Sequence, residues 1–261
     1  MQNYIKILII FSITFGSFAF SQPGLPPPLK SIVYHIENPR FSGDTSKQGT
    51  ATMFREGRFT FLVTNKHVVV NNLGKIADSI FVYENKPDTN GEVISGPQYI
   101  TVYLTRNTIP YYSLPDQSDI DLVIISVGRI NSALNGNSSV ITSHGSTIIP
   151  DSASFPNISD SNILTCIGYP AKVYSKSLDP RSPEYRWGKL ISSKRAFLET
   201  DIPILPGSSG SPVFLNVKSG YSFVGIMTRK LGDRSFAIPS YFIRSHFAHF
   251  FSQMEKQLKE N

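Results

Sequence analysis

The chain has 261 residues, a length that fits one large domain or two small barrels packed together. Charged residues make up only 17% and hydrophobic residues 40%, while glycine and proline occur 18 times each. This composition is typical of a turn-rich β protein and excludes a helical bundle or a disordered chain. The formal net charge of +6 comes without a cluster of lysine and arginine, so we expect no nucleic-acid partner.

Residues 1–21 have the pattern of a secretory signal peptide. Lys6 supplies a positive start, and residues 7–20 are apolar but fall short of the roughly 20 residues that a spanning helix needs. A small-x-small pattern ends at Ser21. We therefore expect cleavage after Ser21, a secreted or periplasmic mature protein, and no stable membrane insertion after cleavage. Residues 22–30 contain four prolines and predict an extended lead-in rather than a helix.

Short β-rich runs follow the lead-in. Residues 49–54 and 59–64 flank a charged turn with a glycine, which predicts a hairpin. The second of these runs leads directly to His67, at a point where the chain turns. A lone histidine in such a place is more often structural than catalytic. Further strands are predicted at 31–36, 79–83, 99–104 and 122–127.

Asp121 stands at the mouth of the nearly all-apolar run 122–127, which predicts a buried strand. A carboxylate in that place is costly unless it has a partner. Asp121 is therefore a candidate to orient a histidine. Asp119 lies one pleat earlier on the same face and is the rival.

Residues 128–160 are rich in serine, asparagine, glycine and proline and predict a connection between two halves. The single cysteine, Cys166, excludes an internal disulfide, and its apolar surroundings predict an inert buried thiol. His246 and His249 belong to the predicted C-terminal helix, where we expect surface or rim positions and no metal site. Strands are predicted at 163–167, 188–192, 196–200, 212–214 and 222–227. The helix, from about residue 240, has one apolar face made of Ile243, Phe247, Phe250, Phe251, Met254 and Leu258.

Residues 207–212 have the sequence GSSGSP. A backbone with so few side chains can fold tightly, expose one hydroxyl and point neighbouring N–H groups into one small space. An oxyanion hole requires that arrangement. The six residues alone fit a glycine-serine turn between two strands equally well.

Five stretches in chain order resemble trypsin-like serine peptidases, particularly the bacterial HtrA proteases. They are 64–68 (TNKHV), 121–124 (DLVI), 207–212 (GSSGSP), 225–226 (GI) and 236–239 (FAIP). The resemblance implies an all-β, chymotrypsin-like fold with two six-stranded antiparallel β-barrels over residues 31–135 and 155–238. A C-terminal α-helix over 240–259 would complete a peptidase domain spanning 31–261.

The same resemblance implies a serine endopeptidase that hydrolyses a polypeptide substrate through an acyl-enzyme without a cofactor. Ser209 would attack the peptide bond, His67 would act as general base and Asp121 would orient the imidazole. The N–H groups of Gly207 and Ser209 would form the oxyanion hole. Thr228 occupies the place where the family carries a hydroxyl near the acid.

Several positions depart from the family pattern. Animal members carry an aspartate immediately before the catalytic serine, where it captures a new N-terminal amine on activation. Ser208 stands there in this chain, so we expect an enzyme that needs no such insertion. Pro203 replaces the acid of trypsin, which argues against cleavage after Arg or Lys. Arg229 and Lys230 follow Thr228 at the expected edge of the substrate-binding pocket and would favour acidic residues.

Two alternatives compete with the peptidase. A non-catalytic peptide- or protein-binding module on the same fold would be marked by a missing triad member, and none is missing. An α/β-hydrolase esterase requires G-x-S-x-G, but Gly210 comes one place too early. Its triad order would also require His246 or His249 as the base. The sequence carries no signal of the oligomeric state.

Overall fold

The computed structural model describes residues 27–39, 47–57, 59–70, 74–106, 109–129, 144–160, 162–170, 182–193, 196–217 and 220–260. The predicted signal peptide and most of the lead-in lie outside these residues. The end of the lead-in forms one helical turn, α1 (Pro27–Lys30), so the prediction of an extended chain is wrong there. Proline is tolerated in the first turn of a helix because the N–H that it lacks would have no helical partner.

The first half of the chain is a sheet in the order β5-β4-β1-β2-β3-β9-β8, with β10 paired in parallel to β2. Its other pairings are antiparallel. No ladder of the described residues joins β5 to β8, so the expected first barrel is not confirmed. The strands are β1 (Val33–Asn38), β2 (Lys47–Glu56), β3 (Phe59–Thr64), β4 (Ser79–Pro87), β5 (Val93–Tyr103), β8 (Tyr112–Ser113), β9 (Val123–Arg129) and β10 (His144–Gly145). The strand β8 has two residues, and a strand this short already paired to β9 offers β5 almost no ladder for closure.

The second half is a closed antiparallel barrel in the order β11-β12-β13-β16-β15-β14, as expected. Register shifts in the β12–β13, β14–β15 and β15–β16 pairs allow the strong bending that closure needs. The strands are β11 (Ile163–Gly168), β12 (Glu184–Ser192), β13 (Leu198–Thr200), β14 (Pro212–Val217), β15 (Gly220–Leu231) and β16 (Arg234–Pro239). The mostly β architecture does not fit an α/β-hydrolase.

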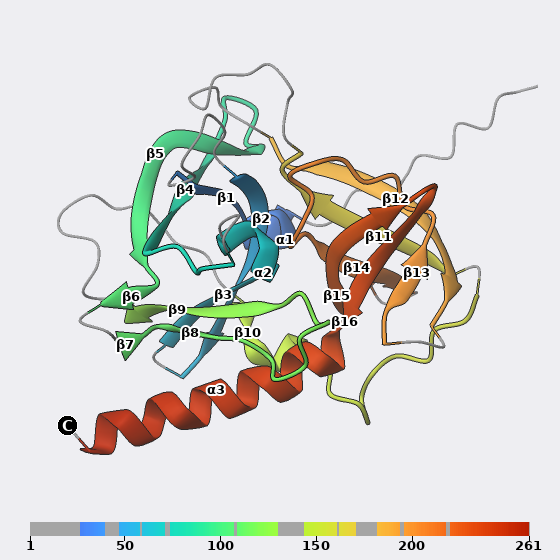
Figure 1. Cartoon of the computed structure of the whole chain (residues 1–261). Coiled ribbons are helices and arrows are strands. Elements are labelled where there is room, and N and C mark those ends of the chain that lie inside the picture. Colours follow the sequence, from blue (N-terminus) through green and yellow to red (C-terminus); the bar gives the residue numbers. More distant parts are fainter. Residues whose placement is uncertain are drawn as a thin grey trace, which may run out of the picture.

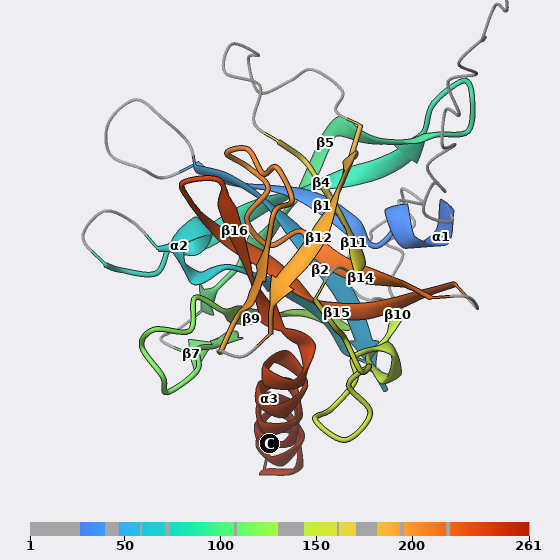
Figure 2. The same ribbon diagram turned by 90° about the vertical axis from the view of Figure 1, so that its right-hand side faces the viewer.

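The predicted C-terminal helix is α3 (Ser240–Glu260). In Figure 1 the sheet lies on the left, the barrel lies on the right, and α3 runs along the bottom away from the barrel. Figure 2 shows α3 end-on below the strands. Phe247 contacts Phe61 of β3 edge-to-face, with 4.8 Å between ring centroids. The apolar face of the helix thus closes the bottom of the core. None of the described helices combines the length and apolarity needed to cross a membrane.

The core connects the two halves. One cluster of buried apolar side chains contains Phe61 and Ile124 of the sheet, Phe214 and Ile226 of the barrel, and Phe247 of α3. A second cluster of buried apolar side chains packs against the sheet of the first half, and a third fills the barrel. The shared cluster holds the two halves against each other, which positions the loops at their junction. The remaining short elements are α2 (Lys66–Val69), η1 (Ser146–Ile148), β6 (Thr105–Arg106) and β7 (Ile109–Pro110).

Candidate active site

His67 lies on the short helix α2, immediately after the buried strand β3. Its Nδ1 is 2.5 Å from Oδ2 of Asp121, and its backbone N–H donates to Asp121 Oδ1 at 2.9 Å. The carboxylate therefore fixes both the backbone and the ring of the histidine. With Nδ1 as the donor, Nε2 is the ring atom left to accept a proton. The side chain is 48% exposed, so a ligand can reach it.

Asp121 lies just before β9 and is held from two sides. Its backbone carbonyl accepts a hydrogen bond from Asn65 Nδ2 at 2.8 Å, and its Oδ2 accepts one from Thr228 Oγ1 at 2.9 Å. The carboxylate thus receives three donors, which offset the cost of its partial burial. The rival Asp119 is exposed, and no contact within the described residues joins it to His67.

Ser209 lies in the turn that precedes β14. Its hydroxyl points to the backbone carbonyl of Thr228 at 3.4 Å, which is longer than an ordinary O–H···O hydrogen bond and makes this a weak contact. Since the hydroxyl of the same Thr228 donates to Asp121, one residue of β15 contacts both the serine and the acid. The structure thereby brings together Ser209, Thr228, Asp121 and His67, which the sequence separates by up to 161 positions.

Glycines shape the turn around Ser209. Gly207 and Gly210 have φ angles of 87° and 85°, in the left-handed region that favours glycine. A Cβ on Gly210 would lie 2.0 Å from the carbonyl oxygen of Thr50. Within the described residues, no backbone hydrogen bond takes the N–H of Gly207 or of Ser209. Both donors are therefore available to a ligand oxygen.

Thr50 of β2 fastens this turn to the other half of the molecule. Its N–H donates to the Ser209 carbonyl at 2.8 Å, and its Oγ1 donates to the Gly207 carbonyl at 2.9 Å. Oγ1 also accepts the N–H of Tyr169 at 2.9 Å, and Thr64 Oγ1 donates to the Thr50 carbonyl at 2.7 Å. Sequence reasoning missed Thr50, because no local pattern marks a threonine whose partners are more than 100 residues away. It also gave no role to Thr64, whose partner Thr50 lies 14 positions earlier on the paired strand.

The remaining predicted residues have definite places. Arg229 and Lys230 follow Thr228 on β15 and are both exposed. The guanidinium of Arg229 stands over the rings of Phe197 and Phe236, 5.0 Å and 5.5 Å from their centroids. Cys166 is free and buried, and its burial raises the pKa of the thiol to about 12. At neutral pH Cys166 is therefore a thiol and not a nucleophilic thiolate.

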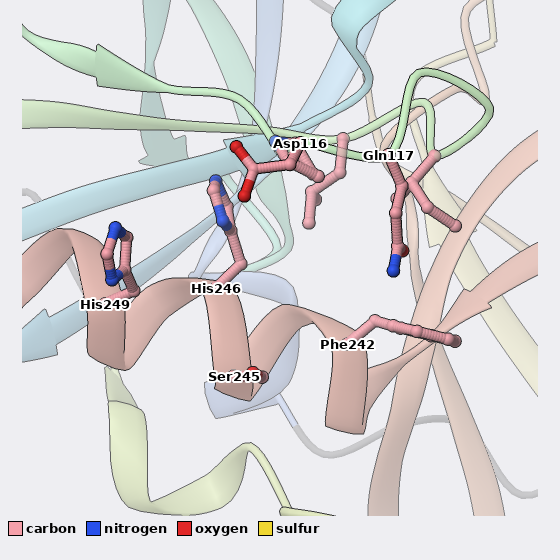
Figure 3. Close-up of a pocket in the computed structure, with 9 residues that line it drawn as sticks. Asp116, Gln117, Phe242, Ser245, His246 and His249 are labelled. Atoms are coloured by element: carbon pink, nitrogen blue, oxygen red, sulfur yellow. The ribbon is translucent and has the colours of Figure 1, made fainter.

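A pocket of about 370 Å³ separates α3 from the segment that carries Asp121. Ile120 and Leu122, the two neighbours of Asp121, form part of its wall. Figure 3 shows His246 on α3 opposite Asp116, with His249 one turn further along the helix. Burial lowers the pKa of His246, so the ring is neutral at pH 7. No group of three or more His, Cys, Asp or Glu in the described part of the chain is placed to hold a metal ion.

No protein-family model matches the chain, and no curated protein matches it. Among solved structures it is similar to a serine endoprotease from Yersinia pestis, with a TM-score of 0.52 and 18% sequence identity. The match covers 85% of this chain and 64% of that one, so this chain spans less than two thirds of the endoprotease. The likeness establishes a shared fold, and the closed barrel fits the chymotrypsin-like architecture.

Proposed function

We propose that this protein is a serine endopeptidase with Ser209 as nucleophile, His67 as general base and Asp121 as orienter. The observation that carries the proposal is the carboxylate of Asp121, which binds the ring of His67 and the hydroxyl of Thr228, whose carbonyl receives the Ser209 hydroxyl. Ser209, His67 and Asp121, three residues suited to nucleophilic catalysis, are thus connected through Thr228 in a peptidase fold.

In the proposed reaction the Ser209 hydroxyl turns from the long contact with Thr228 toward Nε2 of His67. His67 takes the proton as the oxygen attacks the carbonyl carbon of the substrate, and Asp121 stabilises the imidazolium that forms. The imidazolium then gives the proton to the departing amine, which leaves an acyl group on Ser209. Water, activated by the same imidazole, releases the acyl group and regenerates the serine.

The N–H groups of Gly207 and Ser209 would bind the oxygen that becomes negative during attack. Their lack of backbone partners within the described residues supports this role. Removing one such donor from an oxyanion hole typically costs about 100- to 1,000-fold in turnover. Thr50 would keep the hole in shape, since it holds the carbonyls of both residues.

Ser208 supports an enzyme that is active without insertion of a new N-terminal amine. Its side chain is 2% exposed, and its Oγ accepts the N–H of Leu205 at 3.4 Å. Its own N–H donates to the Leu205 carbonyl at 3.0 Å. A neutral serine whose partners are supplied locally needs no charged amine beside it. We further propose export to a secreted or periplasmic location, on the strength of the signal pattern in residues 1–21.

Labelling with a fluorophosphonate probe tests the proposal. We expect the mature wild-type protein to be labelled, and Ser209→Ala and His67→Ala to lose the label. His249→Ala is the matched control, because its imidazole is exposed and belongs to α3. Failure of the wild-type protein to react would favour a non-catalytic binding module on the same fold.

A further inference from the structure

A second pocket, of about 240 Å³, borders the candidate active site at the residue that follows Thr228. It is built by the end of β12, by residues 196–199 at the start of β13, and by β15 and β16. Its lining residues are Ser192, Ala196, Phe197, Glu199, Arg229 and Phe236. The wall is formed mainly by the rings of Phe197 and Phe236 and by the guanidinium of Arg229.

Arg229 is held in this pocket by stacking and not by hydrogen bonds. Its guanidinium stands over Phe197 and Phe236, and such contacts occupy the flat face of the group. The five N–H donors lie in the plane of the guanidinium and point past the rings. None of them takes part in a hydrogen bond or ion pair within the described residues. The result is a positioned cation whose donors are free.

The charge around the pocket favours an anion. Glu199 is the carboxylate in the lining, and its Oε1 lies 3.9 Å from Nη1 of Arg234. Arg234, which also lies 3.7 Å from Asp233 Oδ1, offsets part of this charge, whereas Arg229 has no ion pair within the described residues. Lys230, exposed next to it, adds to the positive potential. An incoming carboxylate would gain two parallel N–H···O bonds from the guanidinium edge.

We infer that this pocket binds the carboxylate of a glutamate or aspartate in the polypeptide substrate and that Arg229 determines this specificity. The inference rests on the proposed function, because it places the substrate at Ser209. The Ser209 hydroxyl contacts the Thr228 carbonyl, and consecutive Cα atoms are about 3.8 Å apart. Side chains within about four residues of the scissile bond can therefore reach Arg229. The two phenylalanine rings would pack against the methylene groups of the bound side chain.

The test uses pairs of peptides that differ only by Glu or Gln at one position, scanned along four residues on each side of the cleaved bond. For the wild-type protein we expect kcat/KM to be about 10-fold higher with Glu at one position, as expected for a charge-assisted hydrogen bond. Arg229→Ala should reduce this ratio below about 2-fold. Arg229→Lys should give an intermediate ratio, because it keeps the charge and loses the two-pronged geometry.

Two more variants locate the effect in the pocket. Glu199→Gln removes the opposing charge from the lining and should raise the Glu-to-Gln ratio further. Lys230→Ala removes the same charge as Arg229→Ala from a neighbouring side chain that does not line the pocket, and should lower the ratio much less than Arg229→Ala does. Equal loss in Lys230→Ala and Arg229→Ala would overturn the inference, since the preference would then come from the general positive potential.

A binding measurement separates this inference from the proposed function. The same fluorescent peptides are titrated into Ser209→Ala, which cannot form an acyl-enzyme, and anisotropy reports affinity. Tighter binding of the Glu peptide, lost in the Ser209→Ala, Arg229→Ala double variant, supports the inference even if the wild-type protein fails to react with fluorophosphonate. Reaction of the wild-type protein without any preference for Glu over Gln, in hydrolysis or binding, leaves the peptidase intact and refutes the subsite.

Discussion

The two halves of the molecule differ in closure and in what they bring to the site. The closed barrel carries Thr228 on β15 and holds Ser209 and the flanking glycines in the turn that precedes β14. The open sheet carries His67 and Asp121 at the end of β3 and the start of β9. The proposed nucleophile thus lies in a turn that joins the closed barrel and is also bound by Thr50 of the sheet. The proposed base and its orienter are held by hydrogen bonds to each other and to Thr228. The contacts of Thr50 and Thr228 form the joint that connects the two parts of the proposed triad.

We expect the largest effect on kcat from substitution of Asp121, the acid carried by the open sheet. Asp121→Asn should lower kcat by about 10,000-fold, because an amide cannot stabilise the imidazolium and can hold the wrong tautomer of His67. Steady-state hydrolysis of a peptide substrate measures the loss. Asp119→Asn is the matched control and should stay near wild-type activity, since Asp119 is exposed. A larger loss in Asp119→Asn would assign the orienting role to the rival.

Gly210 is a tightly packed point of the joint. Gly210→Ala places a Cβ against the Thr50 carbonyl at a φ of 85° and should lower the free energy of unfolding by roughly 3 kcal/mol or more. Urea denaturation followed by tryptophan fluorescence measures this change. Gly57→Ala shares the positive φ, but its Cβ would meet no atom within 4 Å, so it should cost only about 1 kcal/mol. Equal losses in the two variants would show that the joint is not tightly packed.

Thr50 gives the next smaller effect. Thr50→Val keeps the shape of the side chain but removes the hydrogen bonds of Oγ1 to Gly207 and Tyr169. Because both partners are buried, we expect a loss of about 1 to 3 kcal/mol in stability. The oxyanion donors should loosen as well, which lowers kcat more than it changes KM. Thr101→Val, on the exposed edge strand β5, should change neither quantity, and a similar loss there would contradict the role of Thr50.

The smallest expected effect concerns α3 behind the segment of Asp121. Burial lowers the pKa of His246, while Asp116 and a hydrogen bond to the Ser113 backbone oppose that shift and the neighbouring His249 adds to it. The unfolded chain takes up a proton on this residue below about pH 6.5, so its contribution to stability is present above that pH and is lost as the pH falls. His246→Gln should therefore show a smaller drop in Tm between pH 7.5 and 5.5 than the wild-type protein.

The control for His246→Gln is His249→Gln. His249 is exposed, with Nε2 2.9 Å from Gln253 Nε2, whereas His246 is partly buried. Its removal should leave the pH dependence of Tm as in the wild-type protein. If His246→Gln and His249→Gln changed the drop in Tm equally, burial of His246 in the pocket wall would not be the source of the pH dependence.

The candidate site was predicted from the resemblance, because its residues stand in short stretches that match the family pattern. A histidine after an apolar strand, an acid before one and a serine between two glycines are each visible within a few positions. The closed barrel was implied by the resemblance to trypsin-like peptidases, and α3 followed from one helical apolar face. Closure of the first half depends on pairing between distant strands, which no local pattern encodes. The hydrogen bonds by which Thr50 holds the Ser209 turn could not be predicted for the same reason, since its partners lie far along the chain.

The central claim is that Ser209 is the nucleophile, and the site of covalent modification tests it most directly. After reaction with a fluorophosphonate, the wild-type protein should carry one adduct by intact mass, and peptide mapping should place it on Ser209. The neighbouring Ser208 and Ser211 are buried and should be unmodified. An adduct on any other residue, or one that persists in Ser209→Ala, would contradict the account.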